Sequence, residues 1–128
     1  MAVISISLSD ESIESLEKIQ KSLDLAGRSE TVRAAIKIAA SEIKEIEKAE
    51  DAVEGVLIIV HSTHSDRWVG MLQHKYEGMI KTQLHSHLQS KKCLEVMILS
   101  GDPGRFEEMM KDIYSTGKAD YVKFVRGR

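Results

Sequence analysis

The sequence predicts an α+β protein made of two small units, and three observations support this prediction. The chain has 128 residues, which is enough for one or two small domains. Its apolar residues recur with the period of a strand in some segments and with the period of a helix in others. A stretch rich in Glu and Lys, residues 41–55, lies between two such patterns and indicates a domain boundary near residues 48–54.

The first unit, residues 1–48, is predicted to form one strand followed by two helices. Residues 3–8 (VISISL) place Ile and Leu on one face of a strand and mostly Ser on the other. Ser9 is placed to cap the first helix, whose apolar stripe continues to about Leu23. Ser29 is placed to cap the second helix, which has an apolar stripe of its own.

A single strand in this unit leaves its backbone N–H and C=O groups without partners, because no other strand pattern occurs before residue 55. The simplest partner is the same strand of a second chain, paired antiparallel about a two-fold axis. Two such units would share one core of four helices. This is the dimeric ribbon-helix-helix (β-α-α) arrangement, in which the two-stranded ribbon enters the DNA major groove. The alternative is an N-terminal strand that pairs with a neighbouring sheet.

The predicted DNA-binding residues lie on the outer face of the strand and around the start of the second helix. Hydroxyl groups can donate to base edges or accept from them, and the free amides of a helix start can hold a phosphate. The charge of residues 1–48, with seven Lys and Arg against nine Asp and Glu, favours only weak non-specific binding. We therefore expect binding to depend on a few contacts, from Val3, Ser5, Ser7, Arg28, Ser29 and Arg33.

The second unit, residues 53–128, has the predicted order β-α-β-β-α-β, which is the split βαβ pattern of ferredoxin-like folds. Many regulatory domains of the ACT type use this fold, although a fold alone does not give a function. The predicted strands are residues 55–62, 80–89, 93–102 and 120–127, and the predicted helices are residues 65–79 and the segment that follows Pro103 and stops near Gly117.

Two histidines and the only cysteine of the chain lie close together in this unit. His85 and His87 are one residue apart on a predicted strand, so both imidazoles project from the same face. Cys93 begins the next strand, and His74 at the end of the preceding helix is a fourth candidate ligand. Two imidazoles and one thiolate suit Zn(II), Cu(II) or Ni(II). The alternative is a pair of surface histidines beside a cysteine that acts as a small hydrophobic residue.

Other polar residues near this pattern have less specific interpretations. Glu95 lies two residues beyond Cys93 on the same strand face, where it can hold a metal ligand in place. His61 and His64 raise the local histidine count but have no recognisable spacing from the other histidines. We interpret them as loop residues or as a weak accessory site.

Together, the two units resemble the NikR family of nickel-responsive transcriptional repressors over nearly the whole chain. The motif that carries the resemblance is a histidine eleven residues before the His-x-His pair and a cysteine six residues after it, in H(74)…LHSHL(84–88)…CLE(93–95). The resemblance implies a planar Ni(II) site shared by two subunits of a homotetramer, with one ligand, His74, supplied by the neighbouring subunit. The implied ligands are His74, His85, His87 and Cys93, and the residues that support them are Gln73 and Glu95.

The resemblance also implies a function, with three departures from the family pattern. The implied protein is a dimer of dimers that binds operator DNA when Ni(II) favours the DNA-competent arrangement. Val3 stands where well-known members carry an arginine, and Ala34 replaces an acidic residue of a second cation site near Glu30. Residues 62–63 are Ser-Thr where other members have a basic pair. The alternative is a ribbon-helix-helix regulator or antitoxin whose ACT-like domain binds an amino acid, a different metal or a protein partner.

The remaining sequence features argue against several classes of protein. No segment approaches the roughly 18 apolar residues of a membrane span, and the N-terminus lacks the pattern of a signal peptide. A single cysteine is typical of a reducing compartment, so we expect a cytoplasmic protein without a membrane partner. We do not expect an enzyme, because the sequence contains no nucleophile–base set, no glycine-rich phosphate loop and no paired carboxylates.

Overall fold

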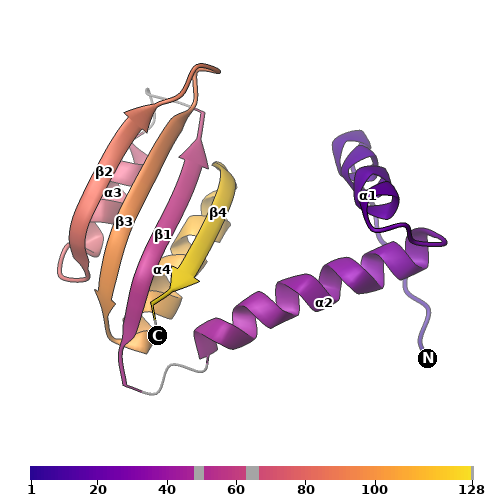
Figure 1. Cartoon of the computed structure of the whole chain (residues 1–128), viewed down its shortest axis with the longest axis horizontal. Helices are drawn as coiled ribbons and strands as arrows, with labels where there is room; N and C mark the ends of the chain where they lie inside the picture. The colour runs from indigo at the N-terminus through magenta and orange to yellow at the C-terminus, as the bar shows by residue number, and fades with distance from the viewer. Residues whose placement is uncertain (48–50, 63–66, 128) are drawn as a thin grey trace. The chain divides into compact units, whose positions relative to one another are not determined.

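The computed structural model describes residues 1–47, 51–62 and 67–127, and the chain forms two compact units, Met1–Ile43 and Lys44–Arg128 (Figure 1). Part of the predicted domain boundary, residues 48–50, lies outside the described residues.

The first unit contains two helices, α1 (Asp10–Ser22) and α2 (Arg28–Glu47), and α2 continues into the second unit. Ser9 caps α1 as predicted, because its side-chain oxygen accepts a hydrogen bond from the backbone N–H of Ser12 at 3.1 Å. The predicted cap of α2 is wrong by two residues. The backbone N–H of Thr31 donates to the carbonyl of Gly27 at 3.1 Å, so Ser29 lies in the first turn of the helix.

Residues 1–9 form no strand in the single chain. Their apolar side chains are exposed, and Ile4 is 80% exposed. A strand requires hydrogen bonds to a neighbouring strand, and among the described residues no other strand pairs with this segment. The ribbon of the predicted ribbon-helix-helix unit therefore stays a prediction that depends on a second chain.

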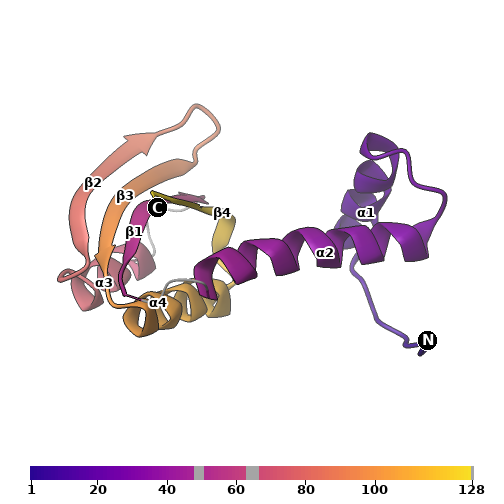
Figure 2. The same ribbon diagram turned by 60° about the horizontal axis from the view of Figure 1, so that its bottom comes forward.

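The second unit has the predicted element order and is an α+β fold of the ferredoxin-like type. Its four strands form an antiparallel sheet with the order β2-β3-β1-β4. Both helices lie on the same side of this sheet (Figure 2). The elements are β1 (Val53–His61), α3 (Trp68–Lys75), β2 (Ile80–His87), β3 (Cys93–Gly101), α4 (Pro103–Thr116) and β4 (Ala119–Arg126).

The ends of α3 and α4 show which predicted helix bounds are correct and which are wrong. Asp102 caps α4 by accepting a hydrogen bond from the backbone N–H of Arg105 at 3.1 Å, and Gly117 ends the helix with a φ of 66°. Helix α3 is shorter than the predicted segment 65–79. The chain turns after Lys75, because the N–H of Met79 donates to the carbonyl of Tyr76 at 2.9 Å. The predicted start of that helix, residues 65–66, lies outside the described residues.

The hydrophobic core of the second unit fills the space between the helices and one face of the sheet. Alternate residues of the strands point into it, and α4 supplies its large side chains. Phe106 of α4 packs against Phe124 of β4 with ring centroids 4.5 Å apart. The fully buried core residues include Leu57, Ile59, Met97, Leu99, Phe106, Met109 and Ile113.

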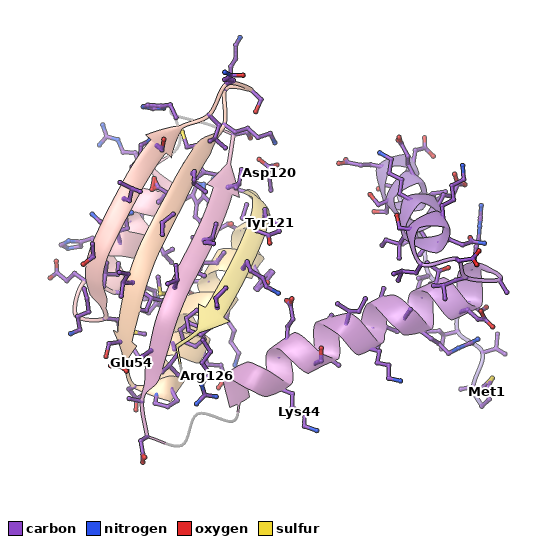
Figure 3. All side chains as sticks on the ribbon, viewed as in Figure 1. Met1, Lys44, Glu54, Asp120, Tyr121 and Arg126 are labelled. Atoms are coloured by element: carbon purple, nitrogen blue, oxygen red, sulfur yellow. The ribbon has the colours of Figure 1, made fainter. Side chains whose placement is uncertain are left out.

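Neither α3 nor α4 covers the opposite face of the sheet (Figures 1 and 2). Ile98 and Val125 lie in one row across the sheet, since both pair with Val56 of β1. The side chains of Ile98, Val125, Leu84 and Tyr121 are more than one-third exposed. Tyr121 is labelled on β4 in Figure 3. We call this apolar surface the open sheet face.

Candidate metal centre

The register of β2 and β3 brings three of the four predicted ligands together. His87 pairs with Cys93 across the two strands, and His85 pairs with Glu95. Residues that pair in this way project from the same face of a sheet. The ligand atoms of His85, His87 and Cys93 all lie within 4.8 Å of one another, and Cys93 Sγ is 3.8 Å from His87 Nδ1.

The hairpin between these strands sets their register. The backbone N–H of Leu88 donates to the carbonyl of Lys92 at 2.7 Å, which closes the turn. Lys91 has a φ of 61°, a left-handed conformation that reverses the chain between the two strands. Cys93 is therefore delivered opposite His87 by the backbone of this turn.

The side chain of Glu95 contacts that of the predicted ligand His85. The Glu95 side chain is almost completely buried, and its Oε1 contacts His85 Nδ1. A carboxylate that accepts a hydrogen bond from Nδ1–H leaves Nε2 of the same imidazole available for a metal ion and makes it a better donor. The supporting role of Glu95 stays a prediction, and this contact is the geometry that the role requires.

Cys93 is fully buried, and this burial raises the pKa of its thiol, with a further contribution from the negative charge of Glu95. The neutral thiol is therefore favoured in the protein alone. A metal ion binds cysteine as the thiolate, so it must displace the thiol proton when it binds. Two imidazoles and one thiolate form a donor set that fits Ni(II) with one coordination position left for a further ligand.

His74 is not part of this three-residue cluster in the single chain. It lies in the last turn of α3, its side chain is 86% exposed, and its Nδ1 is 3.9 Å from Glu77 Oε2. His74 and the predicted supporting residue Gln73 line an open pocket together with His85 and Cys93. The exposed position of His74 leaves it accessible to a second subunit.

The end of α3, which carries His74, is held against α4 by a group of polar contacts. The Tyr76 hydroxyl donates to Asp112 Oδ2 at 2.5 Å, and Lys75 Nζ donates to the same oxygen at 2.8 Å. The Arg105 guanidinium donates to the Lys75 carbonyl at 2.9 Å and lies 4.4 Å from the centre of the Tyr76 ring. We call these four residues the α3–α4 clamp.

The structure assigns His61 a place that the sequence interpretation missed. It is the last residue of β1, it is only 4% exposed, and it pairs directly with Cys93. Its Nε2 is 3.7 Å from Glu95 Oε1, and its ring lies edge-on to Trp68 at 5.6 Å. The signal that could have identified it is the strand period, because His61 continues the inward face of Leu57 and Ile59. His64, which the sequence analysis interpreted together with His61, lies outside the described residues.

The predicted DNA-binding residues are exposed in the first unit, and their role stays a prediction. Val3, Ser5 and Ser7 lie in the N-terminal segment without a strand. Arg28 forms an ion pair with Glu17 at 3.5 Å in the single chain. The residues exposed at the start of α2 are Arg28, Ser29 and Arg33.

Comparisons with known proteins show which family the chain resembles. Residues 54–126 match the family model described as the NikR C-terminal nickel-binding domain. A protein of Methanococcus maripaludis is 31% identical over 123 residues, which cover 94% of this chain and 87% of that protein. A protein of Methanocella arvoryzae is 28% identical over 123 residues, with 94% and 88% covered. Both relatives are provisionally named nickel-responsive regulators.

A solved structure gives independent support for the fold. An uncharacterized protein from Thermotoga maritima matches with a TM-score of 0.55 and 16% identity, over 61% of this chain and 100% of that chain. In the described part of the chain, no helix has the length and apolar character to span a membrane. The comparisons confirm the family resemblance that the sequence predicted and nickel as the predicted metal.

Proposed function

The chain belongs to the NikR family, and on that premise we propose that it is a nickel-dependent repressor that binds operator DNA when Ni(II) is bound. The observation that carries this proposal is the cluster of His85, His87 and Cys93, whose ligand atoms lie within 4.8 Å of one another. A regulator of this kind needs no catalytic group. Its activity is a change in DNA affinity that depends on the metal.

The proposed nickel site has four ligands from two subunits. One chain supplies two imidazole nitrogens and the thiolate sulfur, and His74 of the neighbouring subunit supplies the fourth ligand. The exposure of His74 supports this assignment, and the α3–α4 clamp holds the helix end that presents it. Nickel favours a planar arrangement of nitrogen and sulfur ligands. Glu95, through Nδ1 of His85, fixes the orientation of one of these imidazoles.

The proposed assembly is a homotetramer built as a dimer of dimers. Two separate apolar surfaces support it, namely the open sheet face of the second unit and the exposed apolar residues of the first unit. A second copy of the chain can cover each surface with the same surface of its own, as two-fold symmetry requires. In the first unit, antiparallel pairing of residues 3–8 with their counterparts would form the DNA-binding ribbon.

The proposed link between metal and DNA is thermodynamic. A ligand set shared by two subunits stabilises one relative arrangement of the subunits over the others. If that arrangement is the one in which both ribbons reach their half-sites, Ni(II) raises the affinity for DNA. DNA must then raise the affinity for Ni(II) by the same factor.

The experiment that tests this function measures binding of the full chain to its own promoter region, with and without Ni(II), at fixed salt. We expect specific binding only with Ni(II) for the natural chain and no nickel effect for Cys93→Ser. Apo-protein that binds the same DNA equally tightly would contradict the proposal. A protein that binds no Ni(II) but shifts its DNA affinity with an amino acid would favour the alternative of an ACT-like regulator with an organic ligand.

A further inference from the structure

His61 is a buried imidazole that the proposed nickel site does not use. Both of its ring nitrogens are inaccessible, and neither forms a hydrogen bond within the described residues. The Nε2 atom of His61 lies 3.7 Å from Glu95 Oε1. One oxygen of Glu95, Oε2, is likewise buried without a hydrogen bond among the described residues. Two such groups side by side indicate that this position can take a bound ligand.

The strand register shows what surrounds His61. Cys93 on the central strand β3 pairs with His87 on one side and with His61 on the other. Glu95 Oε1 lies between two imidazoles, since it contacts His85 Nδ1 and is close to His61 Nε2. The rings of His61 and His85 are 6.4 Å apart, centre to centre. The side chains of His61, His85, Cys93 and Glu95 therefore lie at this end of the sheet and line one pocket. Their ligand atoms are spread more widely than those of His85, His87 and Cys93, so side-chain rotation must bring them onto one ion.

We propose that His61, His85, Cys93 and Glu95 form a second metal site, contained within one subunit, for a divalent cation that prefers tetrahedral coordination, such as Zn(II). Two imidazole nitrogens, a thiolate and a carboxylate oxygen are ordinary zinc ligands, and zinc is held by four of them. In this site His85 would coordinate through Nδ1, the ring nitrogen that contacts Glu95 Oε1. No ligand from a second chain is required.

The second site and the nickel site exclude each other, a consequence that rests on the proposed function. Both use Cys93 and His85, so one chain can fill only one of them. An ion held by His61 and Glu95 leaves His87, and His74 of the partner, without a role. The two subunits are then not tied together, and zinc does not favour the DNA-competent arrangement. This competition allows the protein to distinguish a cation that prefers tetrahedral coordination from one that prefers planar coordination.

The test uses two variants that affect the two sites in opposite ways. Zn(II) and Ni(II) are each titrated into the metal-free full chain against a competing chelator, for the natural protein, His61→Gln and His87→Ala. We expect His61→Gln to lower Zn(II) affinity by at least about tenfold and to leave the Ni(II) affinity and spectrum unchanged. His87→Ala should lower Ni(II) affinity by at least about tenfold and leave Zn(II) affinity unchanged. Glu95 is not used, because its substitution affects both sites.

The outcome that overturns the proposal is a loss of Zn(II) affinity in His87→Ala with none in His61→Gln. If His61→Gln does not fold, the crystal structure of the natural protein loaded with Zn(II) decides, since either His61 or His87 coordinates the ion. This test separates the proposal from the function proposed above. If zinc binds through His87, the proposed second site is rejected and the proposed nickel-dependent function is unaffected. If zinc binds through His61 and the protein binds no Ni(II), the second site is supported and the nickel-dependent function is rejected.

Discussion

The second unit encloses its own hydrophobic core, whereas the first unit leaves most of its large apolar side chains exposed. In the second unit, both helices and one face of the sheet bury residues such as Phe106 and Leu57 completely. In residues 1–43, Thr31 is the only buried residue. The exposed apolar residues there include Ile4, Ile6, Ile36, Ile38 and Ile43.

This difference indicates how each unit obtains its stability. Burying one Ile side chain contributes about 1.5–3 kcal/mol, so a pair of helices that buries almost none of them is not stable alone. We infer that the second unit folds within one chain and that the first unit requires a second copy. Trp68, the only tryptophan, lies in the core of the second unit and can report on that unit separately.

The largest effect is expected for Phe106→Ala, which should remove core packing from the second unit. Loss of the buried ring leaves a cavity and should lower the free energy of unfolding by about 3–5 kcal/mol. Urea denaturation followed by Trp68 fluorescence measures this change. Met71→Ala is the control, because Met71 is mostly exposed and its loss should cost no more than about 0.5 kcal/mol. Equal losses in the two variants would show that the second unit does not depend on this core.

Ile6→Glu should break the first unit and leave the second unit intact. We expect a loss of about 1.5–3 kcal/mol from the association of the N-terminal units, because a charged side chain replaces an apolar one in the predicted shared core. The helical signal should then fall at low protein concentration while Trp68 fluorescence stays unchanged. Lys18→Ala is the control, since its ion pair with Glu14 is exposed and contributes little. A helical signal of the natural protein that does not vary with concentration would contradict the need for a second copy.

Cys93→Ser tests the metal centre of the second unit. The variant should lose the sulfur-to-nickel charge-transfer absorption and should bind Ni(II) at least about tenfold more weakly. Folding without metal should change by about 1 kcal/mol or less, because serine occupies nearly the same volume. An unchanged spectrum and affinity would remove Cys93 from the proposed ligand set.

His74→Ala should weaken nickel binding in a different way. Its side chain is exposed in the single chain, so the free energy of unfolding of the second unit should not change. Sedimentation with Ni(II) should show that the tetramer of the variant dissociates at a higher protein concentration than that of the natural protein, because His74 is the ligand supplied to a neighbouring subunit. A tetramer that is equally stable with and without His74 would mean that the nickel site does not join two subunits.

The same contrast between the units decides how much of the fold the sequence predicted. The elements of the second unit were predicted because their period agrees with their start and stop signals, as at Pro103 and Gly117. Residues 3–8 have the apolar period of a strand but no partner strand in the single chain. They therefore form no strand in this structure. Helix α3 was predicted too long because the apolar spacing continues past Tyr76, where the backbone turns.

The sequence predicted the part of the metal centre that depends on the pairing of two neighbouring strands. His85, His87 and Cys93 come together because a short hairpin fixes their pairing. His61 was missed because it was interpreted as a loop residue, although the predicted strand 55–62 includes it and the strand period places it with Leu57 and Ile59. His74 stays a prediction, since the geometry of one chain cannot include a ligand supplied by another.

The smallest effect is expected in the α3–α4 clamp, and it should depend on pH. The pKa of Asp112 lies below its ordinary value of 3.8, chiefly because Lys75 and also Tyr76 donate hydrogen bonds to its carboxylate. Arg105 adds a favourable charge nearby. A lowered pKa means that the folded protein favours the ionised form. The stabilisation is therefore present above pH 3.8 and is lost as the pH falls through the lowered pKa of the folded state.

Asp112→Asn tests this argument, with Glu107→Gln on the same helix as the matched control. The loss of stability caused by Asp112→Asn should be measurable at neutral pH. It should shrink at acidic pH, as the pH falls through the lowered pKa of Asp112, because the natural carboxylate becomes protonated there. Glu107→Gln removes only an exposed ion pair with Lys111 and should have little effect at either pH. The clamp holds the helix end that carries His74, so Asp112→Asn should also weaken Ni(II) binding, but less than His74→Ala does. A loss of stability that is equal at both pH values would show that shape, and not the charge of Asp112, holds α3 against α4.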